Sequence, residues 1–287
     1  MPNVGILTDT TASIPPALAK ELQIETISYY IHRGLDTLRD MIDIDPEAFA
    51  RYLAQADRLP TTSNPNIGDY LNGLKRLAER TKEIVVLTMT SKGSGAYQTC
   101  RSAVEVLRER LPDVHVEVID TLKAAMSQGW AAIEAARSAL EGKSLDAVVV
   151  RARDVAQKAT MFMTGDTLKY LYMGGRIGRA QHLVGSLLNI KPLIGMEDGV
   201  IVGLGATRTR AKAYAKIVEL MCQQVGAQAR IKIAYTHVAA EADVAQLRDL
   251  IVKQFECVET ITTWLSPVLG VHAGPGVVGV QFYPVEQ

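Results

Sequence analysis

Short apolar runs alternate with amphipathic stretches through about the first half of the chain. The runs are rich in β-branched residues and predict buried strands at 3–9, 24–32, 83–90 and 114–120. Between them, apolar residues recur every three or four positions, which indicates helices that bury one face. This alternation is typical of a parallel sheet covered by helices on both sides. We therefore expect an N-terminal α/β/α layer over residues 1–158.

Polar residues just ahead of prolines indicate where several helices begin. Ser13, Asp45 and Asn64 each stand one or two positions before a proline, so each is expected to cap a helix N-terminus. A further helix is expected to start at Ser94 and to run to about Leu111.

The pattern changes after about residue 158. Apolar runs flank Asp198–Gly199, and this dipeptide favours the tight turn that joins antiparallel strands. Further strand-like runs follow, each of the first two preceded by a helical stretch. We expect a C-terminal α/β domain with a mixed sheet over residues 159–287. The helical stretch at 145–158 is the expected boundary, and the two domains would form a single module.

The composition narrows the function classes. The chain has 287 residues, of which 48% are apolar and 22% charged, as in ordinary globular proteins. Lys plus Arg and Asp plus Glu are equal at 31 each. Nucleic-acid binders usually carry a basic excess, so we expect no nucleic-acid partner.

The three cysteines, Cys100, Cys222 and Cys257, are odd in number and far apart. We expect free thiols in a reducing cytoplasm, and neither a disulfide framework nor a metal site. The first residues lack a basic and then apolar stretch, so no signal peptide is expected. No apolar run approaches the roughly 18 residues of a membrane span.

The segment TMTSKGSGAYQT, residues 88–99, follows an apolar strand and opens a helix. A nucleotide-binding P-loop places its lysine after the glycines, whereas Lys92 here precedes Gly93 and Gly95. What remains is Ser94 at the positive end of a helix. That arrangement suits a singly charged anion such as a carboxylate better than a triphosphate.

Three other polar features each have two interpretations. Asp9 ends the first strand, where a phosphotransferase nucleophile could lie, but Thr11 replaces the second acid that this chemistry needs. Hydrogen bonding within the turn is the favoured role of Asp9. The hydroxyls of PTTSNP, residues 60–65, either cap a helix or point at an anion. His272 lies among glycines and prolines and is either structural or part of a site.

Two pairs of arginines are also candidates. Arg176 and Arg179 follow a Gly-Gly helix stop, and Arg208 and Arg210 lie at a strand–helix junction. They are either solvated side chains or contacts with a partner or ligand.

Five segments together resemble the DegV family of bacterial fatty-acid-binding proteins. They are TDTTASIP near the start, TTSNP at 61–65, SKGSGAYQT at 91–99, LKYLYMGGRIG at 168–178 and SPVLGVHAGPG at 266–276. The resemblance covers essentially the whole chain. It implies two α/β domains, no cofactor, and one buried long-chain fatty acid such as palmitate or oleate.

The resemblance also implies site residues. Thr62 and Ser94 would hydrogen-bond the carboxylate, His272 would lie beside it, and Arg208 would supply positive charge, with Arg210 as the alternative. Ser63, Gly95, Asp9 and Arg176 are possible additional site residues. The chain departs from the family at Ala96, where a threonine is common, and at Lys92 and Gly93.

By the same resemblance, the chain is a carrier without catalytic activity of its own. A separate ATP-dependent kinase subunit would phosphorylate the bound fatty acid, and transient contact with a membrane surface is possible. The alternative is a phosphotransferase or hydrolase of small molecules, related to dihydroxyacetone kinase and using Asp9 or His272.

Overall fold

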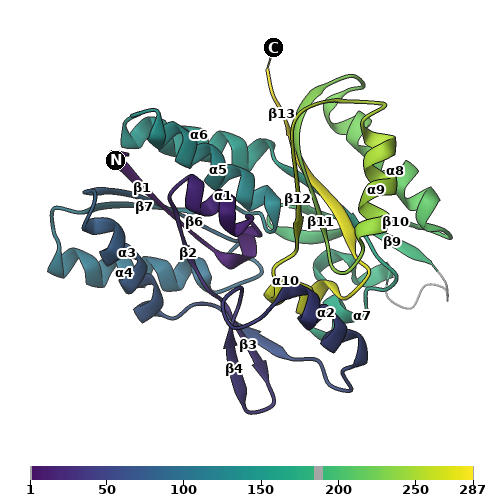
Figure 1. The fold of residues 1–287 in the computed structure, drawn as a ribbon, viewed down its shortest axis with the longest axis horizontal. Helices are drawn as coiled ribbons and strands as arrows, with labels where there is room; N and C mark the ends of the chain where they lie inside the picture. Colours follow the sequence, from purple (N-terminus) through teal and green to yellow (C-terminus); the bar gives the residue numbers. More distant parts are fainter. Residues whose placement is uncertain (1, 184–189, 287) are drawn as a thin grey trace.

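A computed structural model describes residues 2–183 and 190–286, which form three sheets and the helices that pack beside them (Figure 1). The first sheet is entirely parallel and lies in the N-terminal half, as the apolar runs predict. Its strands, in spatial order, are β2 (Ile24–Ile27), β1 (Val4–Asp9), β6 (Glu83–Thr88) and β7 (His115–Asp120).

Helices cover both faces of this parallel sheet. One face packs on α3 (Ile67–Ala78) and α4 (Ala96–Arg110). The other packs on α5 (Met126–Leu140) and α6 (Leu145–Lys158), with the short α1 (Pro16–Glu21) beside them. The predicted three-layer arrangement is confirmed.

The second sheet has six strands and is mixed. Only β11 and β12 run parallel, and all other neighbours are antiparallel. Helices α8 (Arg210–Val225) and α9 (Glu241–Ile251) pack on one face. The strands, in spatial order, are β10 (Val200–Thr207), β9 (Lys191–Glu197), β8 (Thr160–Thr164), β13 (Val278–Pro284), β11 (Arg230–His237) and β12 (Glu256–Trp264). The hairpin predicted around Asp198–Gly199 joins β9 to β10.

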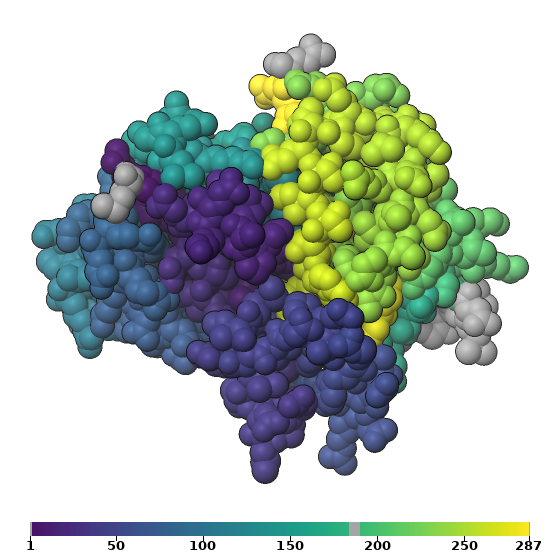
Figure 2. Space-filling model, in the orientation of Figure 1, coloured from purple at the N-terminus to yellow at the C-terminus, as the bar shows by residue number. Residues whose placement is uncertain are grey.

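A third, small antiparallel sheet was not predicted. It consists of β4 (Asp36–Arg39), β3 (Tyr30–Arg33) and β5 (Thr61–Ser63), and α2 (Pro46–Gln55) lies between β4 and β5 in the chain. The β3–β4 hairpin projects from the molecular surface (Figures 1 and 2). The run 24–32 was therefore wrongly predicted as one strand. The chain leaves the edge of the parallel sheet after Ile27, and β3 pairs with β4 and β5 instead.

Of the four predicted helix starts, one is confirmed and three need correction. Asp45 caps α2 as expected, and its Oδ1 accepts a hydrogen bond from the Ala48 N–H at 2.7 Å. However, α3 is capped by Asn66 rather than Asn64, because residues 61–63 are held in β5. Asn66 and Asp69 form a reciprocal capping box there.

The helix starts predicted at Ser13 and Ser94 also differ from the structure. Ser13 does not cap α1; it ends the short 3-10 helix Thr10–Ala12 in a left-handed conformation with φ of 53°, and Pro15 takes the N-cap position of α1. Helix α4 begins at Ala96, two residues after Ser94. Ser94 thus lies in the loop ahead of the helix.

The boundary helix α6 belongs structurally to the N-terminal layer. It packs along α5, and Val148, Ala152 and Val155 are fully buried. The same apolar core continues into the mixed sheet through Ala234 and Tyr283. A division of the chain at 158/159 stays a prediction.

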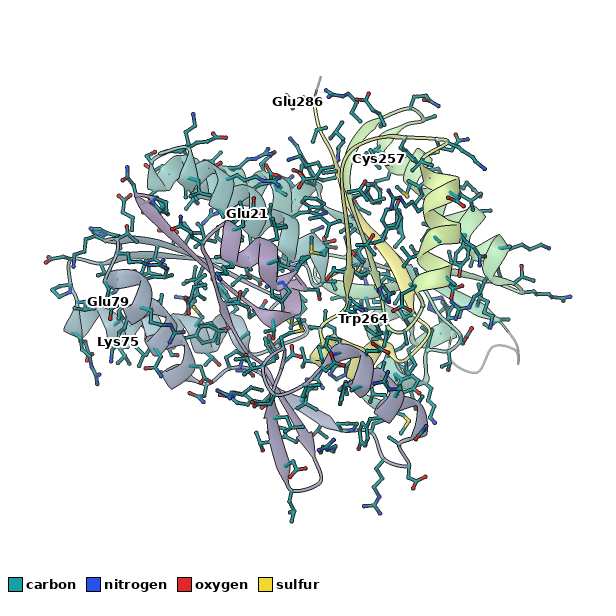
Figure 3. All side chains as sticks on the ribbon, in the orientation of Figure 1. Glu21, Lys75, Glu79, Cys257, Trp264 and Glu286 are labelled. Atoms are coloured by element: carbon teal, nitrogen blue, oxygen red, sulfur yellow. The ribbon has the colours of Figure 1, made fainter. Side chains whose placement is uncertain are left out.

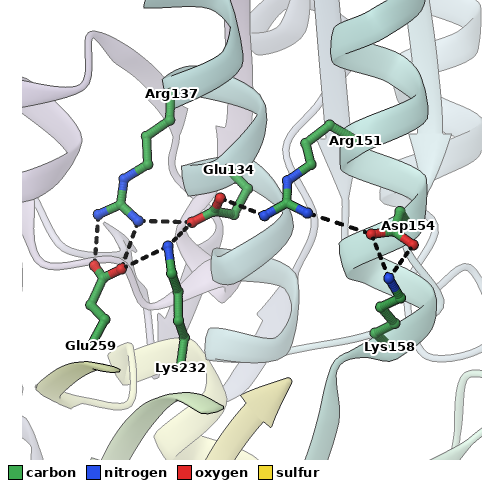
Figure 4. A network of polar contacts seen from close by, with 7 residues as sticks. All are labelled: Glu134, Arg137, Arg151, Asp154, Lys158, Lys232 and Glu259. Atoms are coloured by element: carbon green, nitrogen blue, oxygen red, sulfur yellow. Dashed lines mark hydrogen bonds and ion pairs between the residues drawn. The ribbon is translucent and has the colours of Figure 1, made fainter. Parts of the chain in front are cut away.

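A network of ion pairs also joins the two halves (Figure 4). Glu134 of α5 is almost completely buried and is bonded by Arg137 at 2.7 Å, Arg151 at 2.8 Å and Lys232 at 2.7 Å. Lys232 comes from β11, so this carboxylate links a helix of the N-terminal layer to the C-terminal sheet. Glu259 of β12 pairs with both Arg137 and Lys232 and completes the network.

Candidate functional site

A cavity of about 560 Å³ lies where the three sheets meet. The parallel sheet contributes the loop after β6, and the small sheet contributes β5. The mixed sheet contributes β8 and β9, while α7 (Lys169–Met173) and α10 (Pro267–Ala273) complete the wall. Strand β12 runs from Cys257 towards Trp264, and the next residue, Leu265, lines the cavity (Figure 3).

Most of the cavity wall is apolar. Four methionines, Met89, Met161, Met163 and Met196, line it together with leucine, isoleucine and valine side chains. Methionine is unbranched and flexible, so it fills irregular space and adapts to the shape of an apolar ligand. The space therefore suits a flexible hydrocarbon rather than a polar metabolite.

Two pairs of polar side chains contribute hydroxyl groups to the wall. Thr62 of β5 lies 2.9 Å from His272 of α10, measured from Oγ1 to Nε2. Ser94 Oγ lies 2.8 Å from the hydroxyl of Tyr29 and accepts a hydrogen bond from the Ala96 N–H at 3.2 Å. These pairs place neutral hydrogen-bonding groups in a largely apolar cavity, so they can hold a small polar head.

His272 is uncharged at neutral pH. Burial, and then the positive charge of Arg176, lower the pKa of His272 to about 4. Its Nδ1 is buried and has no hydrogen-bond partner among the described residues. The side chain therefore acts as a hydrogen-bonding group and not as a cation.

Gly174, at the end of α7, packs directly on the His272 ring. A Cβ atom at this position would overlap His272 Nδ1 and would lie 3.1 Å from the Tyr170 carbonyl oxygen. Gly174→Ala is expected to push the ring aside, break its bond to Thr62, and weaken ligand binding about tenfold, the value of one ordinary hydrogen bond. Titration with a long-chain fatty acid measures this.

Gly270→Ala is the matched control for that change. Gly270 lies in the same helix as His272, and an added Cβ would meet nothing closer than 3.9 Å. The fatty-acid affinity of the Gly270→Ala protein should stay within about twofold of wild type, since alanine also favours the helix. Equal affinities of the Gly174→Ala protein and wild type would show that the His272 position does not matter for binding.

The structure brings six of the eight sequence-predicted site residues to the cavity. These are Thr62, Ser63, Ser94, Gly95, Arg176 and His272. The Ser63 hydroxyl also bonds the partly buried His32 at 2.9 Å.

Asp9 does not line the cavity. It is fully buried below the wall and accepts hydrogen bonds from Thr11, Gln128 and the Met89 N–H. Burial raises the pKa of Asp9 to about 6, although the hydrogen bonds from Thr11 and Gln128 oppose that shift. Asp9 holds the turn after β1.

The structure does not bring Arg208 or Arg210 to the cavity. Arg208 is exposed and is not among the lining residues. Arg210 is occupied by ion pairs with Asp166 at 2.9 Å and Asp243 at 3.3 Å. Arg176, which is exposed and lines the cavity, is the arginine of these three that can reach a ligand there.

Tyr29 was missed as a candidate, and the sequence did not single out which methionines line a cavity. Tyr29 follows β2 at the point where the chain leaves the parallel sheet, and no local pattern marks such a point. The methionines lie on strands or directly after one, where a cavity wall and an ordinary core have the same apolar signature.

Within residues 2–183 and 190–286, His, Cys, Asp and Glu side chains do not gather in any group of three that could hold a metal ion. Over the same residues, no helix combines the length and the apolar character needed to span a membrane.

The fold and this site define a class of protein, namely an α/β protein with a large apolar cavity that has uncharged hydrogen-bonding side chains in its wall. The family model described as "Uncharacterised protein, DegV family" matches residues 3–285, so the chain belongs to the DegV family.

Relatives match over almost their full length. A DegV domain-containing protein of Clostridium perfringens is 31% identical over 279 residues, which are 97% of this chain and 98% of the relative. A solved DegV family protein of Thermus thermophilus, described by its fatty acid binding, superposes with a TM-score of 0.92 at 26% identity and covers 99% of this chain and 100% of its own. DegV of Bacillus subtilis, described as a fatty acid binding protein, gives 0.87 at 26% identity, with the same coverage.

Proposed function

We propose that this protein binds a long-chain fatty acid such as palmitate or oleate. The carboxylate is held by Thr62, Ser94 and His272, and the tail occupies the apolar cavity. The observation that carries this proposal is the pairing of neutral hydroxyl donors with a wall of methionine and aliphatic side chains in one cavity. The fatty acid binding described for the Thermus thermophilus and Bacillus subtilis relatives supports it.

The energetics of a fatty acid fit this site. Each buried methylene contributes about 0.8 kcal/mol, so a sixteen-carbon tail gains on the order of 10 kcal/mol before ordering costs. A carboxylate without partners would be expensive in such a space. Hydroxyl donors satisfy it, and the nearby Arg176 guanidinium adds a favourable charge.

The protein would act as a carrier. A separate ATP-dependent kinase subunit would phosphorylate the bound carboxylate, which requires the head group to lie near the cavity mouth. Arg176 is exposed there, as are the neighbouring Tyr172 and Met173 of α7. This surface is also where transient contact with a membrane would occur. The three free thiols accord with a cytoplasmic location.

An enzymatic role is less well supported. A nucleophile must reach its substrate, but Asp9 is completely buried and does not line the cavity. His272 remains available for a phosphotransferase or hydrolase. Turnover of ATP or a phosphate ester by the isolated chain, lost in His272→Ala, would favour that alternative.

Extraction of the natively purified protein tests the proposed function. Organic solvent should release about one long-chain fatty acid per chain, detectable by mass spectrometry. The protein stripped of lipid should bind added palmitate or oleate. An extract without acyl chains, together with no binding of added fatty acid, would refute the proposal.

A further inference from the structure

Two neighbouring groups contact the Ser94 hydroxyl. A serine hydroxyl has one proton to donate and two lone pairs to accept. The Ala96 N–H can only donate, so it occupies one lone pair of Ser94 Oγ at 3.2 Å. The Tyr29 hydroxyl, at 2.8 Å, is the second neighbour.

Tyr29 is built into the cavity wall and stays protonated. Its side chain lines the cavity and is only 4% exposed. Burial, followed by the negative charge of Asp9, raises the pKa of Tyr29 well above its ordinary value. The phenol therefore always has a proton to give. If it gives this proton to Ser94, both lone pairs of Ser94 are filled and the serine proton is free to point at a ligand.

The Thr62–His272 pair likewise combines a hydroxyl with a neutral donor beside it. Neutral His272 carries one ring proton, and its Nδ1 faces Gly174 with no acceptor among the described residues. A buried donor without an acceptor is costly, which favours the proton on Nε2. The Nε2–H then donates to Thr62 Oγ1, and the threonine proton is free in turn.

We infer that Tyr29 is a positioning residue of the fatty-acid site. Its phenol donates a hydrogen bond to Ser94, as the His272 ring donates one to Thr62. Each hydroxyl that meets the carboxylate is then oriented by a neutral donor behind it. This inference rests on the proposed function and adds a residue that the five sequence motifs do not contain.

Hydrogen bonds next to the small three-stranded sheet fix Tyr29 in this position. Tyr29 lies directly before β3, and its backbone N–H donates to Thr10 Oγ1 at 3.1 Å. Its carbonyl oxygen accepts from the Asp40 N–H at 2.8 Å. Asp40 Oδ1 in turn accepts from the Val268 N–H of α10, the helix that carries His272. The same sheet supplies Thr62, so one scaffold aligns both hydroxyl pairs.

The test is a double-mutant cycle on fatty-acid affinity. The proteins are wild type, Tyr29→Phe, Ser94→Ala and the double variant, each stripped of lipid and titrated with palmitate. Tyr29→Phe should bind about tenfold more weakly, since it removes one hydrogen bond and keeps the ring. In the Ser94→Ala background the same change should cost less than about twofold, because its effect passes through Ser94.

Tyr70→Phe is the matched control. Tyr70 is fully buried on α3, and its hydroxyl has no partner among the described residues and does not line the cavity. Its affinity should equal that of wild type.

Three results would overturn the inference. First, Tyr29→Phe could bind palmitate as tightly as wild type. Second, Tyr29→Phe could lower the affinity tenfold in the Ser94→Ala background as well. Third, Tyr70→Phe could lower the affinity as much as Tyr29→Phe does. A wild-type protein that binds no palmitate would instead refute the proposed function, and the inference with it.

Discussion

Replacing both Thr62 and Ser94 with alanine is expected to weaken fatty-acid binding by more than about a hundredfold. A hydrogen bond to a charged group is worth roughly 1.5–3 kcal/mol, so two of them account for at least about 3 kcal/mol. The loss is large because the carboxylate would stay in a largely apolar cavity without its two hydroxyl donors. Titration of the lipid-free protein with palmitate measures the effect.

Thr61→Ala combined with Ser91→Ala is the matched control. These residues have the same chemistry and lie in the same two segments, but both are exposed and neither lines the cavity. The control should bind as wild type does. If both double variants kept wild-type affinity, the carboxylate would have to be held elsewhere.

Glu134→Gln is expected to lower the free energy of unfolding by about 2 kcal/mol. Removing one partner of a buried ion pair typically costs about 3–5 kcal/mol. The expected value is smaller because Arg137 and Arg151 are about a third exposed and are partly screened by water. Without the Glu134 charge, these arginines and Lys232 would face one another across the junction of the two halves (Figure 4). Chemical denaturation measures the change.

The effect of Glu134 depends on pH with a definite sign. Burial alone would raise the pKa of Glu134, but hydrogen bonds from Arg151 and Lys232 lower it from 4.5 to about 2. The stabilisation is therefore present above pH 4.5 and is lost as pH falls towards 2. The difference between wild type and Glu134→Gln should shrink over that range.

Glu219→Gln provides the comparison for this change. Glu219 pairs with Lys216 at 2.6 Å, but both side chains are exposed. Its loss should cost less than about 0.5 kcal/mol. Equal effects of the two substitutions at pH 7 would mean that the buried network does not stabilise the junction.

The parts of the fold that the sequence predicted are those with strong local signals. Buried parallel strands such as β6 are apolar on both faces, so their runs are continuous and easy to recognise. The Asp198–Gly199 turn has an equally strong signal, since few residues other than glycine adopt its backbone conformation, and Gly199 has a φ of 78°.

The small sheet could not be predicted because its pairing is short and distant in sequence. Strand β4 is mostly exposed, and β5 has three residues that pair with β3 about thirty positions earlier. Neither strand is long enough to show a recognisable alternation of apolar and polar residues. Missing this sheet also shifted the predicted start of α3 from residue 66 to 64.

The candidate site was predictable in part through family resemblance. The motifs containing Thr62, Ser94 and His272 are far apart in the chain, and no local sequence pattern predicts that they line the same cavity. The structure brings them to one cavity, but it leaves Arg208 outside. Tyr29 could not be found from the sequence, because its position depends on the unpredicted path from β2 to β3.

The most direct test of the central claim is a carbon-13 NMR spectrum of palmitate labelled at its carboxyl carbon and added to the lipid-free protein. We expect one bound resonance, distinct from free and micellar palmitate, in wild type and in Thr61→Ala/Ser91→Ala. That resonance should move or disappear in Thr62→Ala/Ser94→Ala. A wild-type spectrum without a bound resonance, or the same bound resonance in all three proteins, would contradict the account.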